Sequence, residues 1–371
     1  MSAHRAARRA RAAVARGGAV AVEEILVEPP RATEVMIEVA ACGVCHSDWS
    51  AVDGTLPLPQ PLVLGHEGAG VVVEIGVEVR DFALGDHVVT SFVSMCGECR
   101  YCIAGRPSLC DQAARTVATL PDGSVRTHGR DGEPLGVFCG CGVMAERATL
   151  DVDNVIKIDA SVPLERAALF GCAVTTGVGA VVNTARVRPG ATVAVLGVGG
   201  VGLNVVQGSR LAGASEIVAI DTVAAKLELA RMLGATATID ARGVDDVVKA
   251  IKRLTRGGVD YAFECVGRGE TAAQAFASLR KGGTAVVVGV AAQRDVTPVR
   301  TVSLTLEEKT LTGSYFGSAR PREDIPRLLA LYCAGRLDVD ALVTRSYSIE
   351  EAPAAFADLT AGRNARGVIV F

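Results

Sequence analysis

The stretch TVAVLGVGGVG, residues 192–202, decides the fold. A run of apolar, mostly β-branched residues leads into glycines spaced as GxGxxG, and this order predicts a strand that enters a helix through a tight turn. Such glycines allow a pyrophosphate to approach the helix N-terminus closely. Alone the triplet is a weak signal in a chain with 41 glycines. The candidate binding residues of this turn are Gly197, Gly199, Gly200, Val201 and Gly202.

An acidic residue after the next strand strengthens this interpretation. Asp221 ends the stretch EIVAID, 19 residues beyond Gly202. A carboxylate there accepts hydrogen bonds from the adenosine ribose and repels a 2′-phosphate, so we expect NAD rather than NADP. The alternative is that Asp221 caps the helix that follows.

The pattern of the chain changes near residue 188. Beyond it, six apolar strands alternate with amphipathic segments, whereas the first half has short strands between Gly, Pro and Asp turns. The closing stretch RGVIVF suggests a return to the first half. The predicted fold class is α/β, with a doubly wound parallel Rossmann sheet over residues 174–316 and a β-rich domain over residues 1–173, to which residues 317–371 return.

Composition and charge exclude several partners. A chain of 371 residues exceeds the size of one hydrophobic core, and a net charge of −3 gives no footprint for nucleic acid or anionic lipid. The longest apolar run is too short to span a bilayer. The Arg-rich start resembles a transit peptide, but from about Arg9 it reads better as a first strand. We therefore expect a cytoplasmic protein.

Four cysteines gather in CGECRYCIAGRPSLC, residues 96–110. Disulfides are rare in a reducing cytosol, and a thioredoxin-like pair would show a single CxxC. Four thiolates at this spacing can wrap one tetrahedral zinc with no open position, so we expect a structural zinc. Its predicted ligands are Cys96, Cys99, Cys102 and Cys110.

A second set of possible ligands is scattered along the chain. Cys45 lies in GVCHSD, His66 and Glu67 in LGHEGAG, and Cys172 in LFGCAVTTG. Each alone has an ordinary explanation as a buried thiol or a hydrogen-bonded histidine. Together Cys, His and Cys form the three-ligand shell of a catalytic zinc that leaves a position for water or an alcohol.

With these motifs in this order, the chain resembles the zinc-dependent medium-chain alcohol dehydrogenases over almost its whole length. The resemblance implies a GroES-like catalytic domain with a structural zinc lobe, two zinc ions per chain, NAD and a homodimer, with a tetramer as the alternative. The stretches LEEKTLTGSYFGS and AGRLDVDALVT look most like the nicotinoprotein alcohol dehydrogenases, which use a nitroso acceptor. That likeness suggests a tightly bound NAD.

The resemblance also implies roles for single residues. Glu67 would lie beside the catalytic zinc as an alternate ligand, Asp48 would fix the tautomer of His66, and Ser47 would take the alcohol proton. Ser50 stands where the family usually has the histidine that ends the proton relay. The implied cofactor contacts are His46, Thr176, Lys226, Val290 and Arg366, of which His46, Lys226 and Arg366 have the alternative of being solvated surface charges.

An apolar substrate pocket is implied by the same positional likeness. Its side chains favour a medium-sized or aromatic primary alcohol over ethanol. Cys139 and Cys141 in VFCGCG are interpreted as packing rather than as a third metal site. The loop DGTLPLP has one acid, Asp53, which disfavours the glutathione-linked formaldehyde branch. The implied pocket residues are Leu56, Phe92, Phe138, Cys139 and Tyr315, together with Val290.

The expected function is reversible oxidation of an alcohol with hydride transfer to NAD. Two alternatives stay open. One is a biosynthetic reductase that uses NADH on an aldehyde, an activated alkene or an iminium. The other is a zinc- and nucleotide-binding protein without catalysis.

Overall fold

The computed structural model describes residues 6–371, and these form two compact units. The first unit holds the described residues up to Cys172 together with Arg320–Cys333 and Val343–Phe371. The second holds Ala173–Ala319 and Ala334–Leu342. The α/β fold class predicted from the sequence is confirmed, and the Arg-rich start lies partly outside the described residues.

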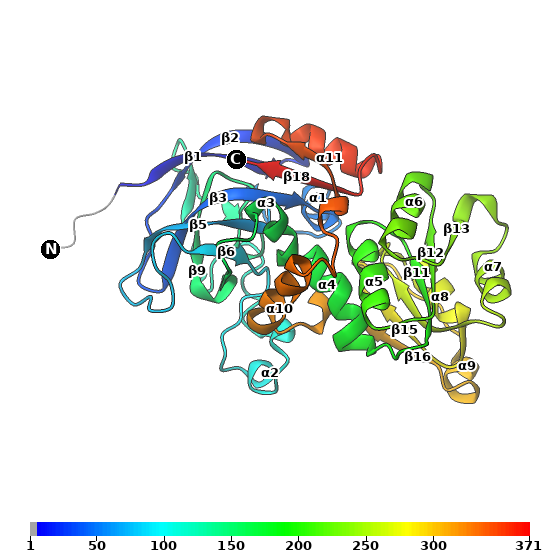
Figure 1. Cartoon of the computed structure of the whole chain (residues 1–371). Coiled ribbons are helices and arrows are strands. Elements are labelled where there is room, and N and C mark those ends of the chain that lie inside the picture. Colours follow the sequence, from blue (N-terminus) through cyan, green and yellow to red (C-terminus); the bar gives the residue numbers. More distant parts are fainter. Residues whose placement is uncertain (1–5) are drawn as a thin grey trace. The chain divides into compact units, whose positions relative to one another are not determined.

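The first unit is built from two β-sheets. The smaller has the order β7-β2-β1-β4-β8, and the larger has the order β10-β6-β5-β3-β18-β17 with β9 also paired to β3. Figure 1 shows the C-terminal strand β18 beside β3, with which it pairs in antiparallel fashion. The strands are β1 (Arg8–Arg16), β2 (Ala19–Val27), β3 (Glu34–Val44), β4 (Leu62–Val63), β5 (Gly68–Ile75), β6 (His87–Thr90), β7 (Thr127–Gly129), β8 (Gly136–Val137), β9 (Arg147–Asp151), β10 (Val155–Lys157), β17 (Val343–Tyr347) and β18 (Arg366–Val370).

Short helices connect these strands, and two longer ones come from the C-terminal part of the chain. Along β5 buried and half-buried residues alternate after Gly70, as expected for a strand with one face toward a core. The helices of this unit are α1 (His46–Val52), α2 (Arg100–Ile103), α3 (Leu164–Ala167), α10 (Pro321–Cys333) and α11 (Ala352–Thr360).

The second unit is one parallel sheet in the order β13-β12-β11-β14-β15-β16, flanked by helices (Figure 1). All of β11 is buried, which explains its continuous apolar sequence. Its strands are β11 (Thr192–Leu196), β12 (Glu216–Asp221), β13 (Ala237–Asp240), β14 (Val259–Glu264), β15 (Leu279–Val287) and β16 (Thr310–Gly313). Its helices are α4 (Ala173–Gly179), α5 (Gly200–Leu211), α6 (Ala224–Leu233), α7 (Val247–Leu254), α8 (Gly269–Ser278) and α9 (Thr301–Leu306).

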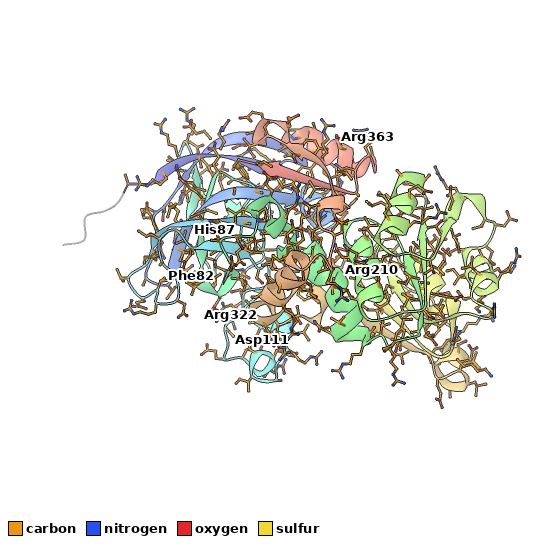
Figure 2. The ribbon with its side chains drawn as sticks, in the orientation of Figure 1. Phe82, His87, Asp111, Arg210, Arg322 and Arg363 are labelled. Atoms are coloured by element: carbon orange, nitrogen blue, oxygen red, sulfur yellow. The ribbon has the colours of Figure 1, made fainter. Side chains whose placement is uncertain are left out.

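One segment lies in a different unit from the one the sequence suggested. The prediction assigned all of residues 317–371 to the first domain, whereas residues 317–319, at the end of the preceding segment, and the separate segment Ala334–Leu342 belong to the second. The buried amide of Gln207 in α5 accepts from the backbone N–H of Asp338 at 2.7 Å and donates to its carbonyl at 3.2 Å. Arg210, labelled in Figure 2, donates to the carbonyl of Arg336 at 2.9 Å. These bonds fasten the segment to α5.

Among the described residues, no single helix is long and apolar enough to cross a membrane. Only the bent pair Leu164–Gly171 and Ala173–Ala185 reaches the necessary length and hydropathy, and only when taken together.

Candidate functional site

A buried cluster of four possible metal ligands lies in the first unit. Cys45, His66, Glu67 and Cys172 each offer one ligand atom, and these atoms all lie within 4.8 Å of one another. Pairing of β3 with β5 explains why residues distant in sequence meet. Cys45 follows the end of β3, and His66 and Glu67 precede the start of β5, to which β3 is antiparallel.

The imidazole of His66 is oriented by a buried carboxylate. Asp48 Oδ2 lies 3.2 Å from His66 Nδ1, which leaves Nε2 as the nitrogen available to a metal. The other carboxylate oxygen of Asp48 accepts from the backbone N–H of Gly65 at 2.8 Å. Burial lowers the pKa of His66, but the charge of Asp48 acts together with Cys45 to outweigh burial and holds the pKa well above its ordinary value. The same charge favours an imidazole that is bound to a cation.

Thr90 fixes the backbone that carries two of these ligands. Its hydroxyl accepts from the N–H of Gly68 at 2.9 Å and donates to the carbonyl of His66 at 3.2 Å. The sequence analysis missed Thr90, because a single threonine in a strand carries no signal of such a role.

Glu67 forms a buried ion pair with Arg366, the first residue of β18. One carboxylate oxygen accepts from Arg366 Nη2, and Arg366 Nη1 donates to the carbonyl of Val44 at 3.1 Å. Burial raises the pKa of Glu67 to about 7, although Arg366 opposes this shift. The second oxygen, Oε2, has no hydrogen-bond partner. Arg366 is only 3% exposed, so it is not the solvated surface charge that was the alternative.

The second metal-binding cluster is the one predicted from the four neighbouring cysteines. The sulfur atoms of Cys96, Cys99, Cys102 and Cys110 also lie within 4.8 Å of one another. The backbone N–H of Cys99 donates to the sulfur of Cys96 at 3.3 Å, and the N–H of Cys96 donates to that of Cys110 at 3.5 Å. Backbone hydrogen bonds lower the pKa of Cys99 to about 6. Such donors stabilise thiolates, the form that binds zinc.

Side chains beyond the last cysteine anchor this lobe within the first unit. Asp153 accepts from Gln112 Nε2 at 3.0 Å and from Arg322 Nη2 of α10 at 3.3 Å. Asp153 therefore links the segment that follows Cys110 to α10.

In the second unit the glycine-rich turn has the geometry that phosphate binding requires. Gly197 has a φ of +85°, and a Cβ on Gly202 would lie 1.9 Å from the carbonyl oxygen of Gly197. By contrast, a Cβ on Gly199 would meet nothing within 4 Å. Gly199 is the N-cap of α5 and supplies no side chain to the first N–H groups, and Gly200 and Val201 form the first turn. The turn therefore fits a pyrophosphate.

Asp221 lies next to this turn, at the end of β12. Its Oδ2 accepts from the N–H of Val198 at 2.9 Å, and its Oδ1 accepts from those of Thr222 and Val223 at 2.8 and 3.0 Å. The N-cap of α6 is Val223, so Asp221 is not the cap of that helix. The sequence did not predict the hydrogen bond between Asp221 and Val198 of the glycine turn. Lys226, half-buried in the first turn of α6, lies five residues further along the chain.

The polar residues predicted near the catalytic metal lie on α1. His46 is exposed, while Ser47 and Ser50 are half-buried. The hydroxyl of Ser47 lies 3.7 Å from the sulfur of Cys45. The backbone N–H of Leu56 donates to the carbonyl of Ser50 at 2.8 Å, which brings the predicted pocket loop onto the end of this helix.

Two predicted pocket residues flank the metal ligands. The rings of Phe92 and Phe138 meet the ring of His66 edge-on, with centroids 5.6 and 5.2 Å away. Cys139 follows with a positive φ of 55°. The thiol of Cys141 contacts the carbonyl of Ser91 at 3.6 Å, and among the described residues neither cysteine belongs to a metal-binding group.

The other predicted contacts lie in the second unit. Thr176 is buried in α4, whereas Val290 and Tyr315 are 57% and 47% exposed.

Two family models match the chain. The model described as an alcohol dehydrogenase GroES-like domain matches residues 31–160, and the model described as a zinc-binding dehydrogenase matches residues 200–333. The matches cover both units.

Similarity to known proteins extends over nearly the full length of this chain. The NDMA-dependent alcohol dehydrogenase of Amycolatopsis methanolica is 44% identical over 94% of this chain and 95% of its own. Two solved structures each align with 98% of this chain and 99% of theirs. The alcohol dehydrogenase zinc-binding domain protein from Burkholderia ambifaria is 38% identical with a TM-score of 0.94, and the benzyl alcohol dehydrogenase from Acinetobacter calcoaceticus is 33% identical with a TM-score of 0.89. The chain is therefore an enzyme of the zinc-dependent medium-chain alcohol dehydrogenase family.

Proposed function

We propose that this enzyme interconverts a medium-sized or aromatic primary alcohol and its aldehyde, with NAD as the hydride acceptor. The observation that carries the proposal is the buried set of Cys45, His66 and Cys172 with Phe92 and Phe138 against the imidazole. When bound, zinc polarises the alcohol oxygen and the nicotinamide accepts the hydride. The name of the benzyl alcohol dehydrogenase, 33% identical to this chain, agrees with an aromatic substrate.

Two zinc ions per chain fit the two ligand sets. Cys45, His66 and Cys172 supply three ligands and leave a position for substrate, with a carboxylate oxygen of Glu67 within the same cluster. The four cysteines of the lobe fill a tetrahedral shell and leave no such position. Only the first set would take part in catalysis.

The chain's own residues orient the ligands and remove the proton. Asp48 favours the tautomer of His66 that carries its proton on Nδ1, which leaves Nε2 free to bind the metal. Ser47 would accept the alcohol proton, because its hydroxyl can both accept and donate and lies 3.7 Å from the sulfur of Cys45. Ser50 lies three residues further along α1, one helical turn away, and is the next hydroxyl on that side.

For the cofactor we propose NAD, bound by the glycine turn and Asp221. Further contacts would come from His46, Thr176, Lys226 and Val290, while Arg366 is engaged by Glu67. The likeness to the NDMA-dependent alcohol dehydrogenase supports a cofactor that stays bound between turnovers. Nucleotide released on denaturing the purified protein is the direct measurement.

Assembly and location are part of the same proposal. We expect a cytoplasmic homodimer, because clustered thiolates as zinc ligands suit a reducing compartment. The edge strand β16, with the exposed Leu304 and Leu306 nearby in α9, offers a surface for a second copy. The domain boundaries near residues 173 and 316 belong to the proposal as well.

The test combines metal analysis with a substrate panel. Purified enzyme should contain two zinc ions per chain and should reduce NAD, whether added or already bound, to NADH with benzyl alcohol or a medium-chain alcohol. Cys45→Ala should lose one zinc and this activity, whereas Cys333→Ser, which alters an exposed cysteine outside both clusters, should lose neither. Absence of NADH formation across the panel, with reduction only of alkenes or iminiums, would support the reductase alternative, which nothing in the comparisons favours.

A further inference from the structure

Residues 314–318, which follow β16 and are called the strap here, have an unusual backbone. Phe316, Gly317 and Ser318 have consecutive positive φ values of 51°, 65° and 48°. Residues with side chains rarely adopt this conformation, and it persists where surrounding contacts impose it. Phe316 is only 1% exposed, so the strap is a packed part of the second unit.

Close packing of two glycines is one of the contacts that impose it. A Cβ on Gly317 would lie 2.5 Å from the carbonyl oxygen of Thr175, and a Cβ on Gly179 would lie 2.5 Å from that of Gly317. The strap therefore lies directly on the backbone of α4, the helix that carries Thr176. Any larger residue at either position would separate the two.

Polar side chains from one helical turn complete the fastening. Thr184 Oγ1 lies 2.8 Å from the hydroxyl of Ser314 and 2.8 Å from that of Ser318, at the two ends of the strap. Asn183 Nδ2 donates to the carbonyl of Gly317 at 3.2 Å. Both side chains come from the π-helical turn Ala180–Ala185 that continues α4. Turns of this kind occur often at functional sites.

The position of the strap in the sheet relates it to the cofactor. A doubly wound sheet binds a dinucleotide along the carboxyl ends of its strands, with one nucleotide on each half. The glycine turn and Asp221 follow β11 and β12, on one half. The strap follows β16 on the other half, where the nicotinamide nucleotide would lie if Asp221 binds the adenosine ribose.

We propose that Thr184 is a positioning residue for the nicotinamide half of the bound dinucleotide. Its hydroxyl bonds to both ends of the strap and holds Phe316, Gly317 and Ser318 in the left-handed conformation before the nucleotide binds. The strap then loses no further conformational freedom on binding, and such preorganisation slows dissociation. This inference rests on the proposed binding of NAD, and it assigns to the chain a means of retaining it.

The test compares Thr184→Val, which removes only the hydroxyl, with Thr184→Ser, which keeps it. Dissociation of NADH from nucleotide-depleted and reloaded protein is followed by fluorescence, and the affinity for AMP, which occupies only the adenosine half, is measured in parallel. Loss of two hydrogen bonds should speed NADH release by about tenfold in Thr184→Val. Thr184→Ser should behave as the unaltered protein, and AMP affinity should stay the same in both.

Matched controls separate positioning from general loosening of the unit. Thr255→Val removes the hydroxyl of another threonine of this unit, which donates to the carbonyl of Ile251 away from the strap, and should leave NADH release unchanged. Ser314→Ala removes one of the two partners of Thr184 and should give an intermediate rate, which keeps the test available if Thr184→Val folds poorly. Unchanged NADH release in Thr184→Val, or an equal loss of AMP and NADH affinity, would overturn the inference. Failure of the unaltered protein to bind NADH would instead contradict the proposed function.

Discussion

Substitution of Asp221 should separate two roles of one carboxylate, of which the structure shows one and the proposed function adds the other. Its Oδ2 accepts from the N–H of Val198 in the glycine turn, and the proposed function adds hydrogen bonds from the adenosine ribose. The first role affects any dinucleotide, whereas the second distinguishes NAD from NADP. The ratio of the two affinities therefore reports the ribose contact, and the absolute affinities report the turn.

The magnitudes follow from the bonds involved. Hydrogen bonds to a charged acceptor contribute about 1.5–3 kcal/mol each. Asp221→Ser should therefore relax the preference for NAD over NADP by about 1–3 kcal/mol and should weaken both cofactors further, because the N–H of Val198 loses its acceptor. Asp221→Asn keeps a side-chain acceptor for Val198 but removes the charge. We expect Asp221→Asn to relax the preference for NAD over NADP to a similar degree as Asp221→Ser. The loss of affinity that the two cofactors share should be smaller in Asp221→Asn.

The assay is a titration of nucleotide-depleted protein with NADH and NADPH, followed by the fluorescence of the reduced nicotinamide. Asp240→Asn, which alters the carboxylate at the end of the neighbouring strand β13, is the control and should leave the ratio unchanged. An unchanged ratio in both Asp221 variants, with equal losses for the two cofactors, would reduce Asp221 to a support of the glycine turn and remove it from cofactor selection.

Further substitutions test the remaining parts of the site. Cys99→Ser should remove one zinc of two and lower the melting temperature, because metal binding in such lobes is folding free energy; a stable variant that has lost only activity would contradict a structural role. Arg366→Met should cost about 3–5 kcal/mol of unfolding free energy by isolating the buried Glu67, and adding Glu67→Gln should recover part of it. Burial raises the pKa of Glu67 to about 7 from an ordinary 4.5, so Glu67 becomes charged, and needs Arg366, as the pH rises through 7. The unfolding free energy lost in Arg366→Met should therefore grow over this pH range; an equal loss at all pH values would contradict this reasoning. Ser47→Ala should lower the oxidation rate by about 10²-fold if Ser47 removes the proton, whereas Ser50→His should raise oxidation near neutral pH if proton release limits the rate; an unchanged pH profile together with a large solvent isotope effect would place the proton route elsewhere.

The parts of the fold that could be predicted are those that local sequence patterns determine. The central strands β11 and β12 were recognisable because a parallel sheet covered on both faces requires continuous apolar runs. The cysteine lobe was recognisable because its ligands are close in sequence. The scattered ligands Cys45, His66 and Cys172 needed the resemblance to a family, since only the pairing of β3 with β5 brings the first two together.

The parts that could not be predicted depend on contacts between distant segments. Nothing in the sequence around Thr90 indicates that its hydroxyl supports the backbone of His66 and Gly68. The placement of Ala334–Leu342 in the second unit depends on the amide of Gln207, more than a hundred residues away. Within the strap, Phe316 and Ser318 likewise adopt a positive φ although their residue types do not favour it.

The helix α1 shows how seven residues can serve two chemically different requirements. Asp48 is fully buried and faces His66, so its carboxylate acts on the metal ligand and stays out of contact with solvent. Ser47 and Ser50 are half-buried and lie three residues apart, a spacing that places side chains on the same side of a helix. A hydroxyl has no pKa near 7, so Ser47 and Ser50 can pass a proton on but cannot keep it. If the proposed route through these two hydroxyls carries the alcohol proton, we expect water or hydroxide to be its final acceptor, and oxidation should then be favoured by alkaline pH rather than by titration of Ser47 or Ser50.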